Sequence, residues 1–160
     1  MMLRDATAAD IPFIMACERG PGYEPFVGRW DETRHLSTLK NEAYRYFVAH
    51  DGAGDRGFFI LHHSELWPTS LYLKRVAMRE ADKGHGKRAL SVLNDWVFAN
   101  TETHRFWLEV AENNARARHV YERLGFVVEG IVRETFLEPD GRWSSSVQMS
   151  LLRPDWLKMR

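Results

Sequence analysis

Residues 107–126 read Trp-Leu-Glu-Val-Ala-Glu-Asn-Asn-Ala-Arg-Ala-Arg-His-Val-Tyr-Glu-Arg-Leu-Gly-Phe and are the most informative stretch for the architecture of the chain. A short strand is predicted over Phe106–Val110, followed by a helix over Asn114–Leu124. Asn114 stands where a helix N-cap is expected, a position that asparagine often occupies. The apolar side of the helix follows helical spacing and contains Ala117, Val120, Tyr121 and Leu124.

A glycine-containing segment precedes this strand and helix. Residues 79–90 read Arg-Glu-Ala-Asp-Lys-Gly-His-Gly-Lys-Arg-Ala-Leu, between a predicted strand over Ser70–Met78 and a helix beginning near Gly86. Gly84 and Gly86 let the backbone turn tightly and approach a ligand. The first N–H groups of a helix are unpaired and its dipole is positive there, so the segment suits a diphosphate. Lys83, Lys87 and Arg88 add positive charge.

Two other interpretations of the glycine segment are open from its residues alone. One is an ordinary turn with solvated lysines. The other is a dinucleotide site, because residues 84–89 fit G-x-G-x-x-A and Glu109 follows Ala89 by 20 residues. Against a dinucleotide fold, residues 79–83 separate the strand from the first glycine. The chain after Glu109 also offers one helix and a hairpin, not a second β-α-β half. The phosphate-loop pattern is absent.

Outward from these segments, the chain predicts the order β-α-α-β-β-β-α-β-α-β-β, a mixed α/β architecture with helices covering a central sheet. Three features define the remaining elements: a helix near Ile11–Arg19, a breaker-rich loop over 20–25, and Pro139-Asp140-Gly141 as a hairpin turn. The expected strands, besides those above, are Met2–Thr7, Tyr44–Ala49, Phe58–His63, Val127–Phe136 and Trp143–Leu152, with a second helix after Trp30. We expect one domain over residues 1–160.

Composition excludes several classes of protein. The 22 basic residues balance 22 acidic residues, which argues against a nucleic-acid binder. Cys17 is the only cysteine, so no disulfide forms within the chain. The N-terminus lacks the apolar core of a secretory signal, and no apolar run approaches the ~18 residues of a membrane helix. The seven histidines show no metal-ligand spacing. We therefore expect a cytoplasmic protein with no metal and no membrane partner.

Together the two segments resemble the cofactor motifs of the GNAT superfamily of N-acetyltransferases. The second motif appears as Leu108-Glu109-Val110, Asn114, Ala117, Tyr121-Glu122 and Gly125-Phe126. The resemblance implies a mostly antiparallel mixed sheet that is splayed between its fourth and fifth strands, with acetyl-coenzyme A (acetyl-CoA) as co-substrate. The ending around Gly130–Arg133 and Met149 is similar to the branch of ribosomal-protein N-terminal alanine acetyltransferases. Relatives that acetylate small amines share this ending.

The resemblance also implies which residues contact the coenzyme. The pantetheine arm would pair with the backbone of Val76, Ala77 and Met78, and Asn114 would hold it from the following helix. The diphosphate would meet Asp82, Lys83, Gly84, His85, Gly86 and Lys87. The superfamily pattern has Gln or Arg three residues before the first glycine. Ala81 stands there, so one side-chain contact to the diphosphate is missing.

Two residues are the candidate catalytic groups. Tyr121, whose phenol is protonated at neutral pH, would donate a proton to the departing thiolate and also lie against the coenzyme. Its helical spacing alone favours a core residue, and the motif match favours the catalytic role. Glu109 would accept the proton of the amine, because related peptide N-terminal acetyltransferases carry a catalytic glutamate there. Its alternative role is structural. His62, His63 and Glu65 are reserve bases, and a backbone N–H near Val76 or Ala77 would stabilise the oxyanion.

The expected acceptor is a primary amine, either a small molecule or a peptide N-terminus. Residues 20–36 and 133–145 are free to line its side of the sheet. They bring aromatic and acidic side chains, namely Tyr23, Phe26, Trp30, Phe136 and Trp143 with Glu24, Asp31, Glu32, Glu134 and Glu138. Such walls would suit a cationic amine, although an ordinary acidic surface explains them equally. A catalytically silent acyl-CoA-binding sensor is the alternative function, and a homodimer through the C-terminal hairpin stays open.

Overall fold

The computed structural model describes residues 1–160 and contains one seven-stranded sheet in the order β1-β2-β3-β4-β5-β7-β6. The strands are β1 Met2–Asp5, β2 Tyr44–Asp51, β3 Gly54–Ser64, β4 Trp67–Met78, β5 Arg105–Ala111, β6 Val127–Leu137 and β7 Trp143–Leu152. Neighbouring strands are antiparallel except β4 and β5, which are parallel. The predicted mixed α/β sheet is therefore confirmed.

Helices cover both faces of the sheet. They are η1 Ala8–Asp10, α1 Ile11–Glu18, α2 Glu32–Leu39, α3 His85–Asn100, α4 Ala115–Arg123 and α5 Arg153–Lys158. Helices α3 and α4 pack on one face through the larger apolar core, which includes Leu93, Val97 and Tyr121. Helix α1 packs on the other face through a smaller core that includes Ile11, Ile14 and Trp30. None of the helices is both long and apolar enough to cross a membrane.

Several predicted boundaries need correction. Strand β4 begins at Trp67 instead of Ser70, because the turn after β3 is only Glu65-Leu66. The turn between β2 and β3 is likewise shorter than residues 51–57, since β3 already begins at Gly54. Helix α5 is an element beyond those that the sequence predicts. Its buried Trp156 packs on Phe98 at the end of α3, which fixes the C-terminus against the core.

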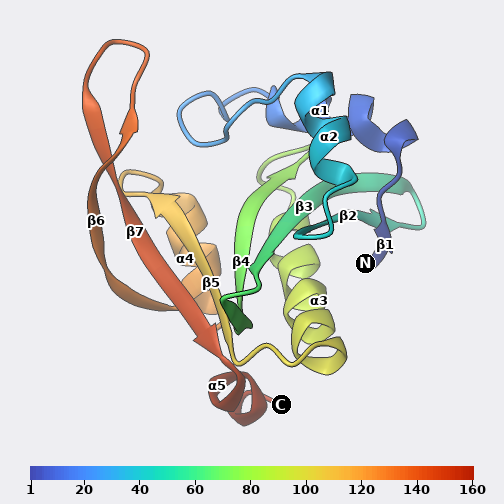
Figure 1. Ribbon diagram of the computed structural model, residues 1–160, viewed down its shortest axis with the longest axis vertical. Helices are drawn as coiled ribbons and strands as arrows, with labels where there is room; N and C mark the ends of the chain where they lie inside the picture. Colours follow the sequence, from blue (N-terminus) through green and yellow to red (C-terminus); the bar gives the residue numbers. More distant parts are fainter.

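The sheet opens between its parallel strands. Strands β4 and β5 lie close together near their first residues and diverge towards the opposite end, beside the projecting β6–β7 hairpin (Figure 1). Strand β7 inserts between β5 and β6, so β6 forms the edge. This arrangement leaves a gap in the middle of the sheet.

Candidate active site

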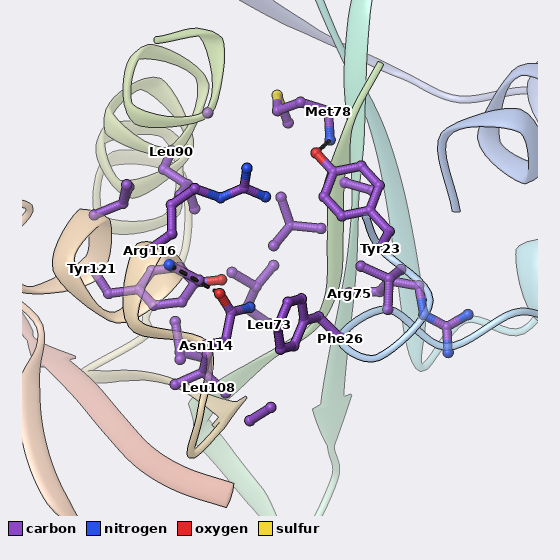
Figure 2. Close-up of a pocket in the computed structure, with 18 of the residues that line it drawn as sticks. Tyr23, Phe26, Leu73, Arg75, Met78, Leu90, Leu108, Asn114, Arg116 and Tyr121 are labelled. Atoms are coloured by element: carbon purple, nitrogen blue, oxygen red, sulfur yellow. Dashed lines mark hydrogen bonds between the residues drawn. The ribbon is translucent and has the colours of Figure 1, made fainter. Parts of the chain in front are cut away.

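The gap in the sheet begins directly after three paired residues. Parallel pairing of β4 with β5 ends at Tyr72 and Trp107, whose rings stack with centroids 4.2 Å apart. Beyond them, β4 stays paired only with β3 up to Met78, and β5 only with β7 up to Ala111. A cavity of about 390 Å³ lies between the two strands (Figure 2). Each wall therefore presents backbone groups without a strand partner.

Strand β4 contains a β-bulge at the start of the gap. Arg75 lies opposite Ile60 and Leu73 opposite Leu61, so Lys74 is the additional residue. A bulge re-aims the side chains of a strand. Here both Lys74 and Arg75 reach the ring of Trp30, on the face covered by α1. Both also line the cavity.

The backbone N–H of Met78 points into the gap. It donates a hydrogen bond to the hydroxyl of Tyr23, with 3.3 Å between the two atoms (Figure 2). Burial raises the pKa of Tyr23, while the Met78 N–H opposes that rise. The side chain of Tyr23, in the loop after α1, therefore accepts a hydrogen bond from a backbone N–H of β4 that has no strand partner. Val76, Ala77 and Met78, the residues predicted to pair with a pantetheine arm, all line the cavity.

The glycine segment forms the next part of the wall. Gly84 is the N-cap of α3 with a φ of 71°, and a Cβ there would meet no atom within 4 Å. No side chain caps the first N–H groups of this helix. The diphosphate candidates Asp82, Gly84, His85, Gly86 and Lys87 line the cavity, whereas Lys83 does not. The first turn of α3 thus presents free donors to the cavity, as the sequence predicts.

Arg116 is a cavity residue that lies outside the predicted site. Its Nη1 lies 3.1 Å and 3.2 Å from the two carboxylate oxygens of Asp82, which links α4 to the glycine segment. Asp82 itself has a φ of 60°, an uncommon conformation for a residue with a side chain. Arg116 brings a guanidinium to the region where Ala81 offers no polar group. Its position two residues after the N-cap Asn114, in the first turn of α4, is the sequence feature that indicates a place near the cavity.

Asn114 and Tyr121 place α4 against the cavity. The Asn114 side chain accepts a hydrogen bond from the Ala117 N–H at 3.2 Å, which confirms its N-cap role. Tyr121 is 7% exposed and packs on Phe126, yet its hydroxyl is bonded to no other protein group. Burial raises the pKa of Tyr121 well above its ordinary value, with smaller contributions from Tyr23 and Tyr72. Tyr121 is therefore both a core residue and a protonated wall of the cavity.

Glu109 lines the cavity from β5. It faces away from the core residues Phe106 and Leu108, and its Oε2 accepts a hydrogen bond from Ser146 Oγ at 3.0 Å. The structure thus brings Tyr121 and Glu109 to one cavity from opposite faces of the sheet.

The three reserve bases lie elsewhere. His62 packs on Tyr44 with tilted rings, and His63 lines a separate cavity between β3 and the end of α3. Glu65 is exposed in the turn before β4.

The acceptor side differs in charge from the expected acidic cleft. Tyr23, Phe26 and Phe136 line the cavity, but none of the five carboxylates expected there does, namely Glu24, Asp31, Glu32, Glu134 and Glu138. Lys74 and Arg75 stand in the wall instead. No group of three or more His, Cys, Asp or Glu residues lies close enough to hold a metal ion.

A buried polar network supports this wall. Glu18 is fully buried, and its two oxygens bind Arg75 Nη1 at 2.8 Å and His35 Nε2 at 3.0 Å. His35 Nδ1 lies 3.0 Å from the Tyr46 hydroxyl. Burial works against ionisation of Glu18, but His35 and Arg75 together lower its pKa below the ordinary value. Arg75 consequently points away from the cavity centre, towards Glu18 (Figure 2).

Comparison with known proteins agrees with this architecture. The spermidine N(1)-acetyltransferase of Vibrio cholerae is 32% identical over 83 residues, which cover 51% of this chain and 47% of that protein. The 5-NmdU N-acetyltransferase of Pseudomonas phage PaMx11 is 33% identical over 91 residues, covering 56% and 61%. The chain thus spans about half the length of the curated relatives it matches. None of these relatives is a ribosomal-protein acetyltransferase, so they do not support that branch.

The similarity in structure extends over nearly the whole chain. A crystal structure of the Vibrio cholerae spermidine N-acetyltransferase in complex with CoA and spermine superposes with a TM-score of 0.85 at 24% identity, covering 98% of this chain and 97% of that one. At this identity the likeness concerns the fold. The family model described as "Acetyltransferase (GNAT) domain" matches residues 1–127. The chain therefore belongs to the family of GNAT acetyltransferase domains.

Proposed function

We propose that this protein is an N-acetyltransferase that moves an acetyl group from acetyl-CoA to a primary amine. The observation that carries the proposal is the gap after Tyr72 and Trp107, with Tyr121 lining it from α4 and Glu109 from β5. Family membership supports the reaction class, and the similar crystal structure contains CoA.

The shape and donors of the gap fit coenzyme A. The N–H of Met78, which has no strand partner and donates to Tyr23, would pair with the pantetheine arm in the manner of an added strand. The first turn of α3 presents unpaired N–H groups beside Gly84, where a diphosphate would be stabilised by the helix terminus. Lys87 and Arg116 would add charge, and Asn114 would contact the arm.

The proposed chemistry assigns one proton transfer to each catalytic group. Glu109 accepts a proton from the ammonium, directly or through water, which leaves a neutral amine. The amine nitrogen then attacks the thioester carbonyl, and a backbone N–H of Val76 or Ala77 would stabilise the oxyanion. As the carbon–sulfur bond breaks, Tyr121 donates its proton to the thiolate, and the amine nitrogen loses its second proton, which restores the Tyr121 phenol. Glu109 passes the first proton to solvent. The products are an acetamide and the coenzyme thiol.

The coenzyme part of the proposal is tested by thermal unfolding with acetyl-CoA, using NAD and ATP as controls. A ligand at ~100 times its dissociation constant adds about 2.7 kcal/mol of stability. In a domain of this size that raises the unfolding midpoint by several degrees. A rise with acetyl-CoA alone supports the proposal. A rise with NAD alone, or none at all, contradicts it. Binding without thiol release from any primary amine would indicate the acyl-CoA sensor instead.

A further inference from the structure

The acceptor-side wall of the cavity carries a cation without a counter-ion. Lys74 is partly buried and lines the cavity, and it forms neither an ion pair nor a hydrogen bond with another residue. Its ammonium lies 5.7 Å from the ring centroid of Trp30 and 5.8 Å from that of Tyr72. Removing a charged group from water costs free energy that a partner of opposite charge would offset.

Other cations surround the same tryptophan. The guanidinium groups of Arg34 and Arg75 lie 4.2 Å and 4.3 Å from the Trp30 ring centroid. The buried carboxylate of Glu18 is already engaged by Arg75 and His35. Burial, Arg75 and Arg34 all lower the pKa of Lys74, and only Glu109 raises it. Of the two cations in this wall of the cavity, Arg75 is thus paired with Glu18, whereas Lys74 has no carboxylate partner.

Lys74 and Glu109 stand across the gap from one another. Each follows by two residues the last paired residue of its strand, Tyr72 on β4 and Trp107 on β5. They are near enough for Glu109 to influence Lys74, yet too far apart to form an ion pair. A molecule lying between them would meet a carboxylate on one side and an ammonium on the other.

We propose that the acceptor is a primary amine that carries an anionic group, a carboxylate or a phosphate, close to its amine, and that Lys74 binds this group. The inference rests on the proposed function and specifies its substrate class. The amine would face Glu109 while the anionic group would face Lys74. A polyamine would instead bring a second ammonium against Lys74, and Glu109 is the carboxylate across the gap that the reacting amine already occupies.

Matched pairs of amines test the proposal by isothermal titration calorimetry on the protein with CoA bound. The pairs are L-phenylalanine with L-phenylalaninamide and phosphoethanolamine with ethanolamine, with spermidine as the cationic reference. We expect the anionic member of at least one pair to bind about tenfold more tightly, as one charge-assisted hydrogen bond gives. The pair that shows the preference identifies the anion as carboxylate or phosphate.

Three variants identify the cation responsible. Lys74→Met should abolish the preference within a pair, while Lys74→Arg should retain most of it. Lys40→Met removes an exposed lysine at the end of α2 and should leave the preference unchanged. Equal binding within both pairs, tighter binding of spermidine, or a preference that survives Lys74→Met would overturn the proposal.

The same samples separate this inference from the proposed function. Thiol release from acetyl-CoA with spermidine but with no anionic amine would keep the transferase and refute its substrate class. No thiol release with any amine would refute the transferase, while the calorimetric ratios would still decide whether Lys74 binds an anion.

Discussion

Lys74 of β4 and Glu109 of β5 occupy equivalent places on opposite walls of the sheet gap, each two residues beyond the stacked rings of Tyr72 and Trp107. The β-bulge at Lys74 and the hydrogen bond from Ser146 to Glu109 keep both groups on the acceptor side. The coenzyme side of the same cavity is formed by α3 and α4. In the proposed reaction the acid, Tyr121, and the base, Glu109, therefore reach the gap from opposite faces of the sheet.

Replacing Tyr121 with phenylalanine should lower kcat for thiol release by roughly a hundredfold or more, the usual contribution of a general acid. Its hydroxyl bonds to no protein group, so affinity for acetyl-CoA and the unfolding midpoint should stay close to those of the wild type. Calorimetry and circular dichroism provide these two controls. Because burial raises the pKa of Tyr121, wild-type kcat should hold at pH 10, where an ordinary tyrosine is half ionised. Full activity of the variant would exclude Tyr121 as the acid.

Replacing Glu109 with glutamine should lower kcat/KM most at neutral pH. A base is needed to remove the ammonium proton, and this need disappears at high pH, where the amine is already neutral. The deficit should therefore shrink between pH 7 and pH 10 in a thiol-release assay. Ser146→Ala, which removes the hydrogen-bond donor but leaves the carboxylate, is the matched control. A loss of the same size at every pH would point to a structural role.

Arg116→Ala should weaken acetyl-CoA binding by about tenfold or more, the loss expected for a charge-assisted hydrogen bond. The guanidinium lies at the glycine segment, paired with Asp82, and the chain has no Gln or Arg at position 81 to replace it. Calorimetry with acetyl-CoA provides the measurement. Arg123→Ala, at the exposed far end of α4, should leave the affinity unchanged. Equal affinities for both variants would remove Arg116 from the coenzyme site.

Glu18→Gln should destabilise the protein by about 3–5 kcal/mol at pH 7, because Arg75 would lose the partner of a buried ion pair. The pKa of Glu18 is lower in the folded protein than in the unfolded chain, where it is about 4.3. The ionised carboxylate therefore adds to the free energy of unfolding above pH 4.3, and this stabilisation disappears as the pH falls through the pKa of the folded protein. Urea unfolding at pH 7 and pH 4 should show a smaller difference in the free energy of unfolding between variant and wild type at pH 4. Asp5→Asn, which breaks the exposed pair with Arg45, should have little effect. An equal difference in the free energy of unfolding at both pH values would contradict the stabilising role of ionised Glu18.

The sequence predicts the coenzyme side of the site better than the acceptor side. Gly84, Asn114 and Tyr121 lie in two short segments whose local patterns define a turn, a cap and a helix face. Lys74 depends on a bulge that shifts β4 by one residue against β3, which no local pattern reveals. The pairing of Arg116 with Asp82 joins positions 34 residues apart.

Several carboxylates that the sequence predicts on the acceptor side lie away from the cavity because of their local structure. Glu24, Asp31 and Glu32 belong to a loop and helix start that turn their carboxylates away from the cavity. Asp31, for example, caps α2 by accepting the Arg34 N–H. The turn at residues 139–141 predicts that β6 pairs with β7, but it does not predict which of the two strands pairs with β5. In the structure it is β7.

The most direct measurement of the central claim is the stoichiometry of transfer. The protein would be incubated with acetyl-CoA and a mixture of primary amines that includes amino acids, phosphoethanolamine and spermidine. Thiol release would be followed while mass spectrometry identifies the acetylated product. We predict one N-acetylated amine for each thiol released, and loss of both in the Tyr121→Phe variant. Thiol release without an acetylated amine, or no release with any amine, would contradict the assignment of this protein as an N-acetyltransferase.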